Sequence, residues 1–415
     1  MRRVACGSAR EVGLAVRFGP GVIVAAAFIG PGTVTACTLA GTNFGFALLW
    51  TLVFATLSTV VLQDMAARLG AGARLGLGEA LMQALPFAPI RWLGAGMVFV
   101  ALAVGNSAYE AGNLAGGALG LSAVLGEDSP QTWIVAVLAW FSAMVILSGR
   151  YRLIERVLVG LVAIMSAAFV AGALLVRPDI GGLASGLVPQ IPDGSLFTAI
   201  ALIGTTIVPY NLFLHAAAAR ERWPGASGTR DARIDAGLSI GLGGLISMMI
   251  LATAASTLFG TGLKIDSAAD MAGALEPTLG AAARYLIGVG LFAAGLTSAI
   301  TAPVATAFAL TEILPIRDPG RRMLVFRAVG LCVLAIGTAI ALLGIRPVDV
   351  ILVAQVANGI LLPVIALFLL VVMNRSKILG AHVNGIWSNL AGGIVVLVTL
   401  ALGTRLVLRA LGIVP

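Results

Sequence analysis

The stretch that decides the fold is AAAFIGPGTVTACTLAG, residues 25–41. It is apolar enough to lie in a membrane, yet the tetrapeptide Gly30-Pro31-Gly32-Thr33 stands in its middle. Proline lacks an N–H and clashes with the preceding turn, and glycine costs about 1 kcal/mol relative to alanine within a helix. The sequence therefore predicts an interrupted helix, and the freed backbone groups must face protein or a water-filled cavity because lipid cannot hydrogen-bond them.

The composition around this stretch identifies the class of protein. Of the 415 residues, 59% are hydrophobic and only 11% are charged, whereas soluble chains carry about a quarter charged residues. The 52 glycines suit close contacts between membrane helices. The three cysteines are scattered without metal-ligand or disulfide spacing, and no polar interval is long enough to build a separate domain. These features predict a polytopic integral membrane protein in a plasma or inner membrane.

Apolar runs of about 20 residues give the number of spans. The sequence predicts eleven: 18–42, 44–67, 92–121, 131–148, 154–176, 195–217, 236–260, 282–314, 323–345, 349–373 and 384–412. The start of the chain is too polar, and too long before its apolar run, to be a cleaved signal. We therefore expect the first span to remain in the mature protein, preceded by an amino-terminal segment over residues 1–17.

Basic residues predict the orientation of these spans. Of the 26 lysines and arginines, twenty fall in the amino terminus and every second loop, and six fall in the alternate loops and the carboxyl terminus. This asymmetry predicts a cytoplasmic amino terminus and an outward-facing carboxyl terminus. It also accounts for the net charge of +8 without a nucleic-acid partner, because the basic residues are spread over short loops.

A second interruption lies in the sixth span, FTAIALIGTTIVPYNLFLHAAAA, where Val208-Pro209-Tyr210-Asn211 stands at the centre. Spans one and six are equivalent members of two five-helix units, residues 18–176 and 195–373, followed by an eleventh helix over 384–412. Paired interruptions at equivalent positions indicate an inverted-repeat transporter with its site at the bilayer midplane. We therefore expect an all-α fold of the leucine-transporter type, with helices 1 and 6 broken around a substrate site.

Several stretches resemble one known family. FGPGVIVAAAFIGPGTVTACTLAGTNFGFALLW is similar to the first two helices of the NRAMP divalent-metal transporters, and TTIVPYNLFLHAAA is similar to their sixth helix. GLTSAIT (residues 295–301) and AQVANGILLP (residues 354–363) resemble parts of the eighth and tenth helices. The resemblance implies an inverted-repeat fold of eleven helices and uptake of divalent cations such as Mn²⁺ or Fe²⁺, usually coupled to protons.

The chain departs from this family at the residues that would bind metal. Where the family has Asp-Pro-Gly-Asn, this sequence has Gly30-Pro31-Gly32-Thr33, and where the family has Met-Pro-His, it has Val208-Pro209-Tyr210. The carboxylate, the thioether and the neighbouring histidine are therefore missing. The residues that remain to bind substrate are the following: Gly30, Thr33, Val208, Tyr210, Asn211 and Gln355, around helix breaks at Pro31, Gly32 and Pro209.

The chemistry of these residues leaves two classes of substrate open. Carbonyls, hydroxyls and amides are neutral, hard ligands, which suit a cation that keeps most of its water, such as Mg²⁺, better than Mn²⁺ or Fe²⁺. A metal would be held at most by Thr33, Asn211 and Gln355 with backbone carbonyls. The same neutral break suits a small organic solute, because free N–H groups at a half-helix start can hold a carboxylate.

Two buried ionisable residues are candidates for a coupling or proton path. Glu110 lies mid-span, where a carboxylate is costly unless it is paired or protonated, and Asn106 and Asn113 flank it on one helix face. His215 follows the second break and is either a structural residue or a proton relay. Because the family's acids and histidines are reduced here to these two, we expect weak or absent proton coupling.

No other chemistry is indicated by the sequence. It contains no nucleotide-binding loop, catalytic triad or redox motif, so we expect neither an enzyme nor an ATP-driven pump, and no cofactor. The expected partners are the lipid bilayer and a small inorganic or organic substrate. Near the end of the second span, Gln63 and Asp64 are expected to form an interfacial pair beside Arg68.

Overall fold

The structure, a computed structural model, describes residues 29–85, 87–126, 128–148, 152–223, 226–314, 316 and 318–413. All regular secondary structure within these ranges is helical, which confirms the expected all-α fold. Ten of the described helices are long and apolar enough to cross a membrane. The first half of the first expected span lies outside the described residues. The structure therefore describes ten of the eleven expected spans, together with the second half of the first, which is α2.

The long helices follow the order expected from the apolar runs. Their bounds are α2 (Pro31–Phe44), α3 (Leu49–Arg68), α5 (Ala88–Leu125), α6 (Gln131–Ser148), α7 (Arg152–Val176), α9 (Leu196–Thr206), α10 (Pro209–Arg222), α11 (Ala226–Thr257), α14 (Ala282–Ile313), α15 (Pro319–Ala341), α16 (Pro347–Met373) and α18 (Ile386–Ala410). Short elements join them: the π-helix η1 (Leu69–Ala73), α4 (Leu77–Ala84), α8 (Ile180–Gly186), α12 (Ala268–Ala272), α13 (Glu276–Leu279), α17 (Ser376–Leu379) and η2 (Gly380–His382).

Several helices begin earlier than their apolar runs predict, by four residues or more in α5, α11 and α15 (Pro319 instead of 323). Helix α11 starts at Ala226, ten residues before the expected span at 236, and α5 starts at Ala88 instead of 92. The added turns contain basic or amphipathic residues that belong outside a hydrocarbon layer. A helix does not have to end where the bilayer ends, so hydropathy finds the span and misses its extension.

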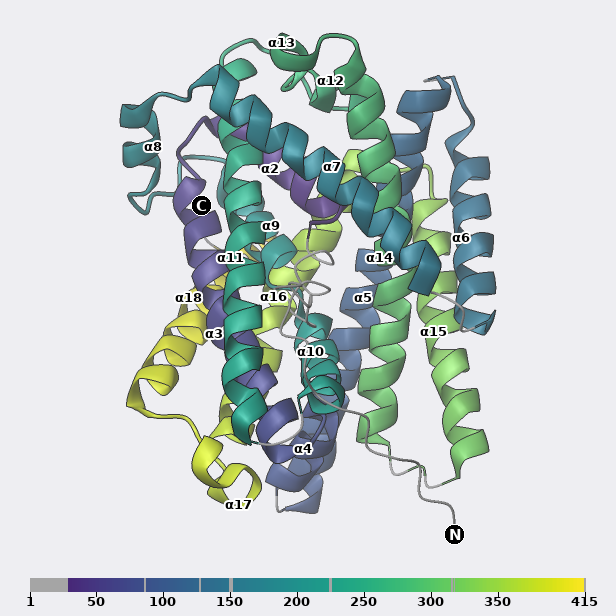
Figure 1. Cartoon of the computed structure of the whole chain (residues 1–415), viewed down its shortest axis with the longest axis vertical. Helices are drawn as coiled ribbons and strands as arrows, with labels where there is room; N and C mark the ends of the chain where they lie inside the picture. Colours follow the sequence, from purple (N-terminus) through teal and green to yellow (C-terminus); the bar gives the residue numbers. More distant parts are fainter. Residues whose placement is uncertain are drawn as a thin grey trace, which may run out of the picture.

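The long helices run roughly along the long axis of the molecule, and α7 crosses them obliquely (Figure 1). Helices α8, α12 and α13 lie toward one end, and α4 and α17 lie at the other (Figure 1). In the α9–α10 span 94% of the most apolar window is buried, compared with 22% in α15 and in α18. The interrupted sixth span therefore lies at the centre of the helix bundle, and α15 and α18 lie at its periphery.

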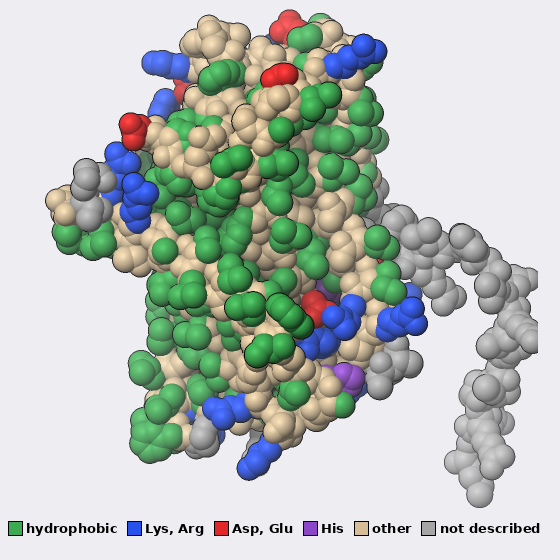
Figure 2. Space-filling view, turned by 90° about the vertical axis from the view of Figure 1, so that its left-hand side faces the viewer, with side chains coloured by type: hydrophobic (Ala, Val, Ile, Leu, Met, Phe, Trp, Pro, Cys, Tyr) green, Lys and Arg blue, Asp and Glu red, His purple; other side chains and the backbone are tan. Residues whose placement is uncertain are grey.

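The outer surface is apolar, as a lipid-facing surface must be. Figure 2 shows hydrophobic side chains spread over much of one face. On α6, Trp133 and Trp140 are 71% and 63% exposed, and large aliphatic residues are similarly exposed on α15 and α18. A contiguous exposed apolar surface of this kind belongs in a membrane. The chain is an integral membrane protein.

Candidate functional site

The sixth span is broken where the sequence predicts. Helix α9 ends at Thr206, Ile207 (φ −106°, ψ 79°) and Val208 (φ −83°, ψ 120°) have non-helical backbone, and α10 begins at Pro209. Proline disfavours helical backbone in the residue before it and cannot donate to the turn above. The break therefore follows from Pro209 itself, and it leaves backbone carbonyls without helical partners at the centre of the bundle.

The first span shows the matching geometry on its described side. Gly30 is extended (φ −97°, ψ −176°) and precedes α2, whose first residue is Pro31. The carbonyl of Gly30 accepts hydrogen bonds from the backbone N–H of Thr33 (3.1 Å) and of Val34 (3.3 Å). Helix α2 thus starts afresh at the predicted position, and the half that precedes Ile29 lies outside the described residues.

The two breaks meet directly. The hydroxyls of Thr33 in α2 and Thr205 in α9 are 2.9 Å apart, and both residues are buried. Gln355 of α16 lies against the same break, because a Cβ added at Gly32 would be 2.3 Å from its Nε2 atom. The structure therefore brings Thr33 of α2, Thr205 of α9 and Gln355 of α16 together, from three helices that are distant in sequence.

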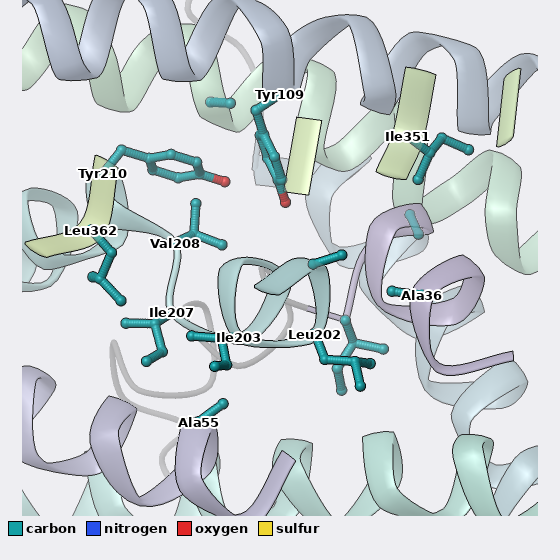
Figure 3. Packing of buried hydrophobic residues seen from close by; sticks show 14 of the residues in the cluster. Ala36, Ala55, Tyr109, Leu202, Ile203, Ile207, Val208, Tyr210, Ile351 and Leu362 are labelled. Atoms are coloured by element: carbon teal, nitrogen blue, oxygen red, sulfur yellow. The ribbon is translucent and has the colours of Figure 1, made fainter. Parts of the chain in front are cut away.

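Val208, Tyr210 and Asn211 line the second break. In Figure 3 the ring of Tyr210 lies near that of Tyr109 from α5, with Val208 beside them. The ring centroids of Tyr109 and Tyr210 are 5.7 Å apart, with an interplanar angle of 59°. Asn211 is buried, and neither its Oδ1 nor its Nδ2 atom has a hydrogen-bond partner among the described residues. Tyr210 is thus held by aromatic packing, and the Asn211 amide is available to a polar ligand.

The donors at the breaks are uncharged. The described residues contain no cluster of three or more His, Cys, Asp or Glu side chains that could hold a metal ion. Around the breaks the available groups are carbonyls, hydroxyls and amides, including a Gln355 Oε1 atom without a partner in the described ranges. A buried polar group left unpaired costs about 1–3 kcal/mol. These amides therefore fit water or a polar solute.

Glu110 does not join this group. On the same helix, α5, Gly112 faces α16 and Gly116 faces Pro31. Glu110 instead packs against α15, because a Cβ added at Gly337 of α15 would lie 2.6 Å from the Glu110 Cβ. Its Oε2 atom accepts a long hydrogen bond of 3.4 Å from Asn113. Successive residues of a helix are rotated by about 100°, so Glu110 points away from the face of α5 that carries Gly112 and Gly116 and lies against the breaks.

His215 lies one turn and a half beyond the break and bonds to α3. Its Nδ1 atom is 2.6 Å from Oε1 of Gln63, and both side chains are buried. The expected pairing of Gln63 with Asp64 is therefore wrong, because adjacent residues on a helix point in different directions. Asp64 instead pairs with Arg68 at 2.9 Å and with Arg233 at 2.5 Å.

Sequence reasoning missed three residues near the breaks, Thr205, Tyr109 and Asn358, and gave a fourth, Gln63, the wrong partner. Thr205 and Tyr109 contact predicted site residues, Gln63 holds His215, and Asn358 lies one turn from Gln355 on α16. Asn358 could have been noted as an amide within an apolar span, where polar side chains are rare. The other three are recognisable only through their partners in space.

Comparison with known proteins places this geometry in a family. A family model described as "Natural resistance-associated macrophage protein-like" (Nramp) matches residues 21–409. The divalent metal cation transporter MntH of Klebsiella pneumoniae (strain 342) is 27% identical over 409 residues, which cover 97% of this chain and 96% of that protein. MntH of Yersinia pestis (strain Pestoides F) is 27% identical over 398 residues, 95% of each chain.

Solved structures share the fold. The Eremococcus coleocola manganese transporter in complex with an aromatic bis-isothiourea substituted compound has a TM-score of 0.76 at 23% identity, over 95% of this chain and 88% of that one. MhsT in complex with L-phenylalanine has a TM-score of 0.60 at 16% identity, over 95% and 99%. The expected fold of the leucine-transporter type is therefore confirmed. With a family model that matches nearly its whole length, the chain belongs to the Nramp family of membrane transporters.

Proposed function

We propose that this protein is a secondary transporter that carries a divalent cation with most of its hydration shell retained, with Mg²⁺ as the leading candidate. The observation that supports this proposal most directly is the set of buried, uncharged donors at the two helix breaks, with amide atoms of Asn211 and Gln355 unpaired in the described structure. The relatives named above carry divalent metals or manganese, which favours a cation over other solutes.

The chemistry of the donors separates Mg²⁺ from manganese. Thr33, Asn211 and Gln355 with the nearby carbonyls offer neutral oxygen ligands, whereas Val208 offers no donor atom where a soft ligand would select a transition metal. Without a carboxylate, a site gains little Coulomb energy for stripping water from a doubly charged ion. Mg²⁺ gives up its water reluctantly and is commonly bound through it. A neutral site of this kind fits a hydrated ion.

The orientation and the repeats complete the proposal. Residues 18–176 and 195–373 act as two inverted five-helix repeats, and alternating access exposes the breaks first to one side and then to the other. The basic loops assign the end that carries α4 and α17 to the cytoplasm, with the amino terminus on that side and the carboxyl terminus outside.

Proton coupling is proposed to be weak or absent. Tyr210 occupies the place of the histidine expected next to the break, and Glu110 packs against α15, away from Thr33 and Gln355. His215, bonded to Gln63, is the one histidine in the sixth span. A substrate-driven proton flux would need a carboxyl or imidazole within reach of the solute.

A small organic solute is the second candidate. Helices α2 and α10 both begin at a break, and the amino end of a helix favours a carboxylate. The similarity in fold to MhsT, solved with L-phenylalanine, supports this alternative. Gly30 favours it as well, because a carboxylate at that position would repel an anionic solute.

Uptake into proteoliposomes decides between the two. Purified protein is reconstituted, and accumulation of Mg²⁺, Mn²⁺, neutral amino acids and small carboxylates is measured against empty vesicles. We expect Mg²⁺ uptake that Thr33→Val reduces. Thr399→Val on α18 is the matched control, because Thr399 is buried and, among the described residues, its hydroxyl donates only to carbonyls of its own helix, those of Val395 and Val396. Accumulation of an amino acid or carboxylate without Mg²⁺ would transfer the proposal to the organic solute.

A further inference from the structure

We propose that Asn358 is a specificity-determining residue. Together with Asn211, it forms hydrogen bonds with the water that surrounds the solute, while the solute moves between the breaks and the end of the molecule that carries α4 and α17. This inference rests on the proposed function and adds a residue to its path. Asn358 lies within the stretch AQVANGILLP, but it is not among the residues that the sequence analysis expects to bind substrate.

The first observation is the unpaired state of its side chain. Asn358 is 1% exposed, and neither its Oδ1 nor its Nδ2 atom has a hydrogen-bond partner in the part of the chain that the structure describes. A primary amide can donate two hydrogen bonds and accept two. Within a 27-residue apolar helix, an amide that makes none of these bonds destabilises the fold.

The second observation is the position of Asn358 next to residues of the breaks. It follows Gln355 by one turn on α16, toward the end of that helix near α17. Its Oδ1 atom faces α5, where a Cβ added at Gly105 would lie 3.7 Å away. Gly105 precedes Tyr109 by one turn, and the Tyr109 ring contacts that of Tyr210, the neighbour of Asn211. Asn358 therefore lies between Gln355 on its own helix and the turn of α5 that precedes Tyr109, the residue that contacts Tyr210 after the break.

The third observation is a comparison with an amide that has a structural role. Asn106 on α5 is equally buried, but its Nδ2 atom donates to the Thr306 hydroxyl at 2.5 Å and so joins α5 to α14. The Asn358 side chain makes no hydrogen bond to another helix within the described structure. A buried amide that stabilises no contact is suited to a ligand that comes and goes.

The chemistry matches a hydrated cation. The water bound to a divalent ion is a strong hydrogen-bond donor, and amide oxygens accept from it without the charge that would trap the ion. Three amides in succession, Gln355, Asn358 and Asn211, can exchange hydrogen bonds with that shell as the ion passes. Because an apolar residue at 358 would offer no acceptor, the amide favours a solute that keeps its water.

The test uses the full-length protein and compares Asn358→Leu with Asn106→Leu, which have the same change in side chain and the same burial. Leucine has as many heavy side-chain atoms as asparagine and no polar atom. We expect Asn358→Leu to raise Tm by about 2 °C, since it removes unpaired polar atoms. Asn106→Leu should lower Tm because it breaks a bond between helices. In proteoliposomes, Asn358→Leu should raise the KM for Mg²⁺ by about 3- to 10-fold, which is the change expected when one hydrogen bond to the solute is lost.

The outcomes separate this inference from the function on which it rests. Mg²⁺ uptake by the unmodified protein that Asn358→Leu leaves unchanged would overturn the inference alone. A fall in Tm for Asn358→Leu as large as for Asn106→Leu would also overturn it, because Asn358 would then be structural. No uptake of any divalent ion by the unmodified protein would overturn the proposed function and the inference together.

Discussion

The contact between α9 and α16 gives the sharpest structural prediction. A Cβ added at Gly204 would lie 1.9 Å from the backbone oxygen of Gln355 and 2.6 Å from the backbone nitrogen of Gly359. In Gly204→Ala the two helices must separate by about 1.5 Å, the difference between 1.9 Å and the 3.4 Å of ordinary contact. Backbone atoms cannot rotate away, so the strain must be taken up by the helices themselves.

The expected cost follows from two opposing terms. Overpacking of a close contact destabilises by about 1–3 kcal/mol, and the better helix propensity of alanine returns about 0.5–1 kcal/mol. We expect a net loss of about 1–2 kcal/mol and, at an unfolding entropy of about 2.1 cal/mol/K per residue over 415 residues, a fall in Tm of about 1–2 °C. Because the same contact fixes Gln355 against Gly32, Mg²⁺ uptake should fall by about tenfold as well.

The control is Gly241→Ala on α11, where an added Cβ meets no atom within 4 Å. It should leave uptake unchanged and keep or raise Tm, since alanine is the better helix former. Thermal unfolding in detergent and uptake in proteoliposomes measure the two effects. If Gly204→Ala matches Gly241→Ala in both assays, the close contact between α9 and α16 and its control of Gln355 are refuted.

Three further predictions concern the site. Gly30→Asp combined with Val208→Met should raise Mn²⁺ affinity by about tenfold or more, because it adds a charged and a soft ligand; calorimetry with no gain in Mn²⁺ affinity would contradict this. Substrate uptake should not acidify the vesicle lumen, and Glu110→Gln should leave uptake unaffected; a robust acidification abolished by Glu110→Gln would show that Glu110 couples protons. Thr205→Val should lower Mg²⁺ uptake as Thr33→Val does, because each removes the same 2.9 Å hydroxyl contact, and the double variant should be no worse than either single one.

The fold was largely predictable because its main signals are local. Apolar runs identify spans from composition, and Pro209 breaks its helix through its own geometry, whatever surrounds it. The start of α2 at Pro31 follows from the same rule. What hydropathy missed were the added turns of α5, α11 and α15, since a helix continues beyond the membrane when nothing in the sequence stops it.

The site was predictable only in part, because its other half depends on contacts between helices. Thr33 and Gln355 were identified from the breaks and the family pattern, but Thr205 becomes a site neighbour only when α2 meets α9. The direction of Glu110 depends on the rotation of α5 and on Gly337, which no local pattern reveals. Asn358 carries a weak signal, an amide in an apolar span, which becomes informative once its lack of a partner is known.

The central claim is that the site is neutral and does not select transition metals. Calorimetry of the purified, unmodified protein with Mg²⁺ and Mn²⁺, each titrated alone and in competition, tests it most directly. We predict that Mn²⁺ binds no more tightly than Mg²⁺ and that each ion displaces the other, since no sulfur or carboxylate at the breaks distinguishes them. Micromolar binding of Mn²⁺ that Mg²⁺ does not compete away would contradict the claim.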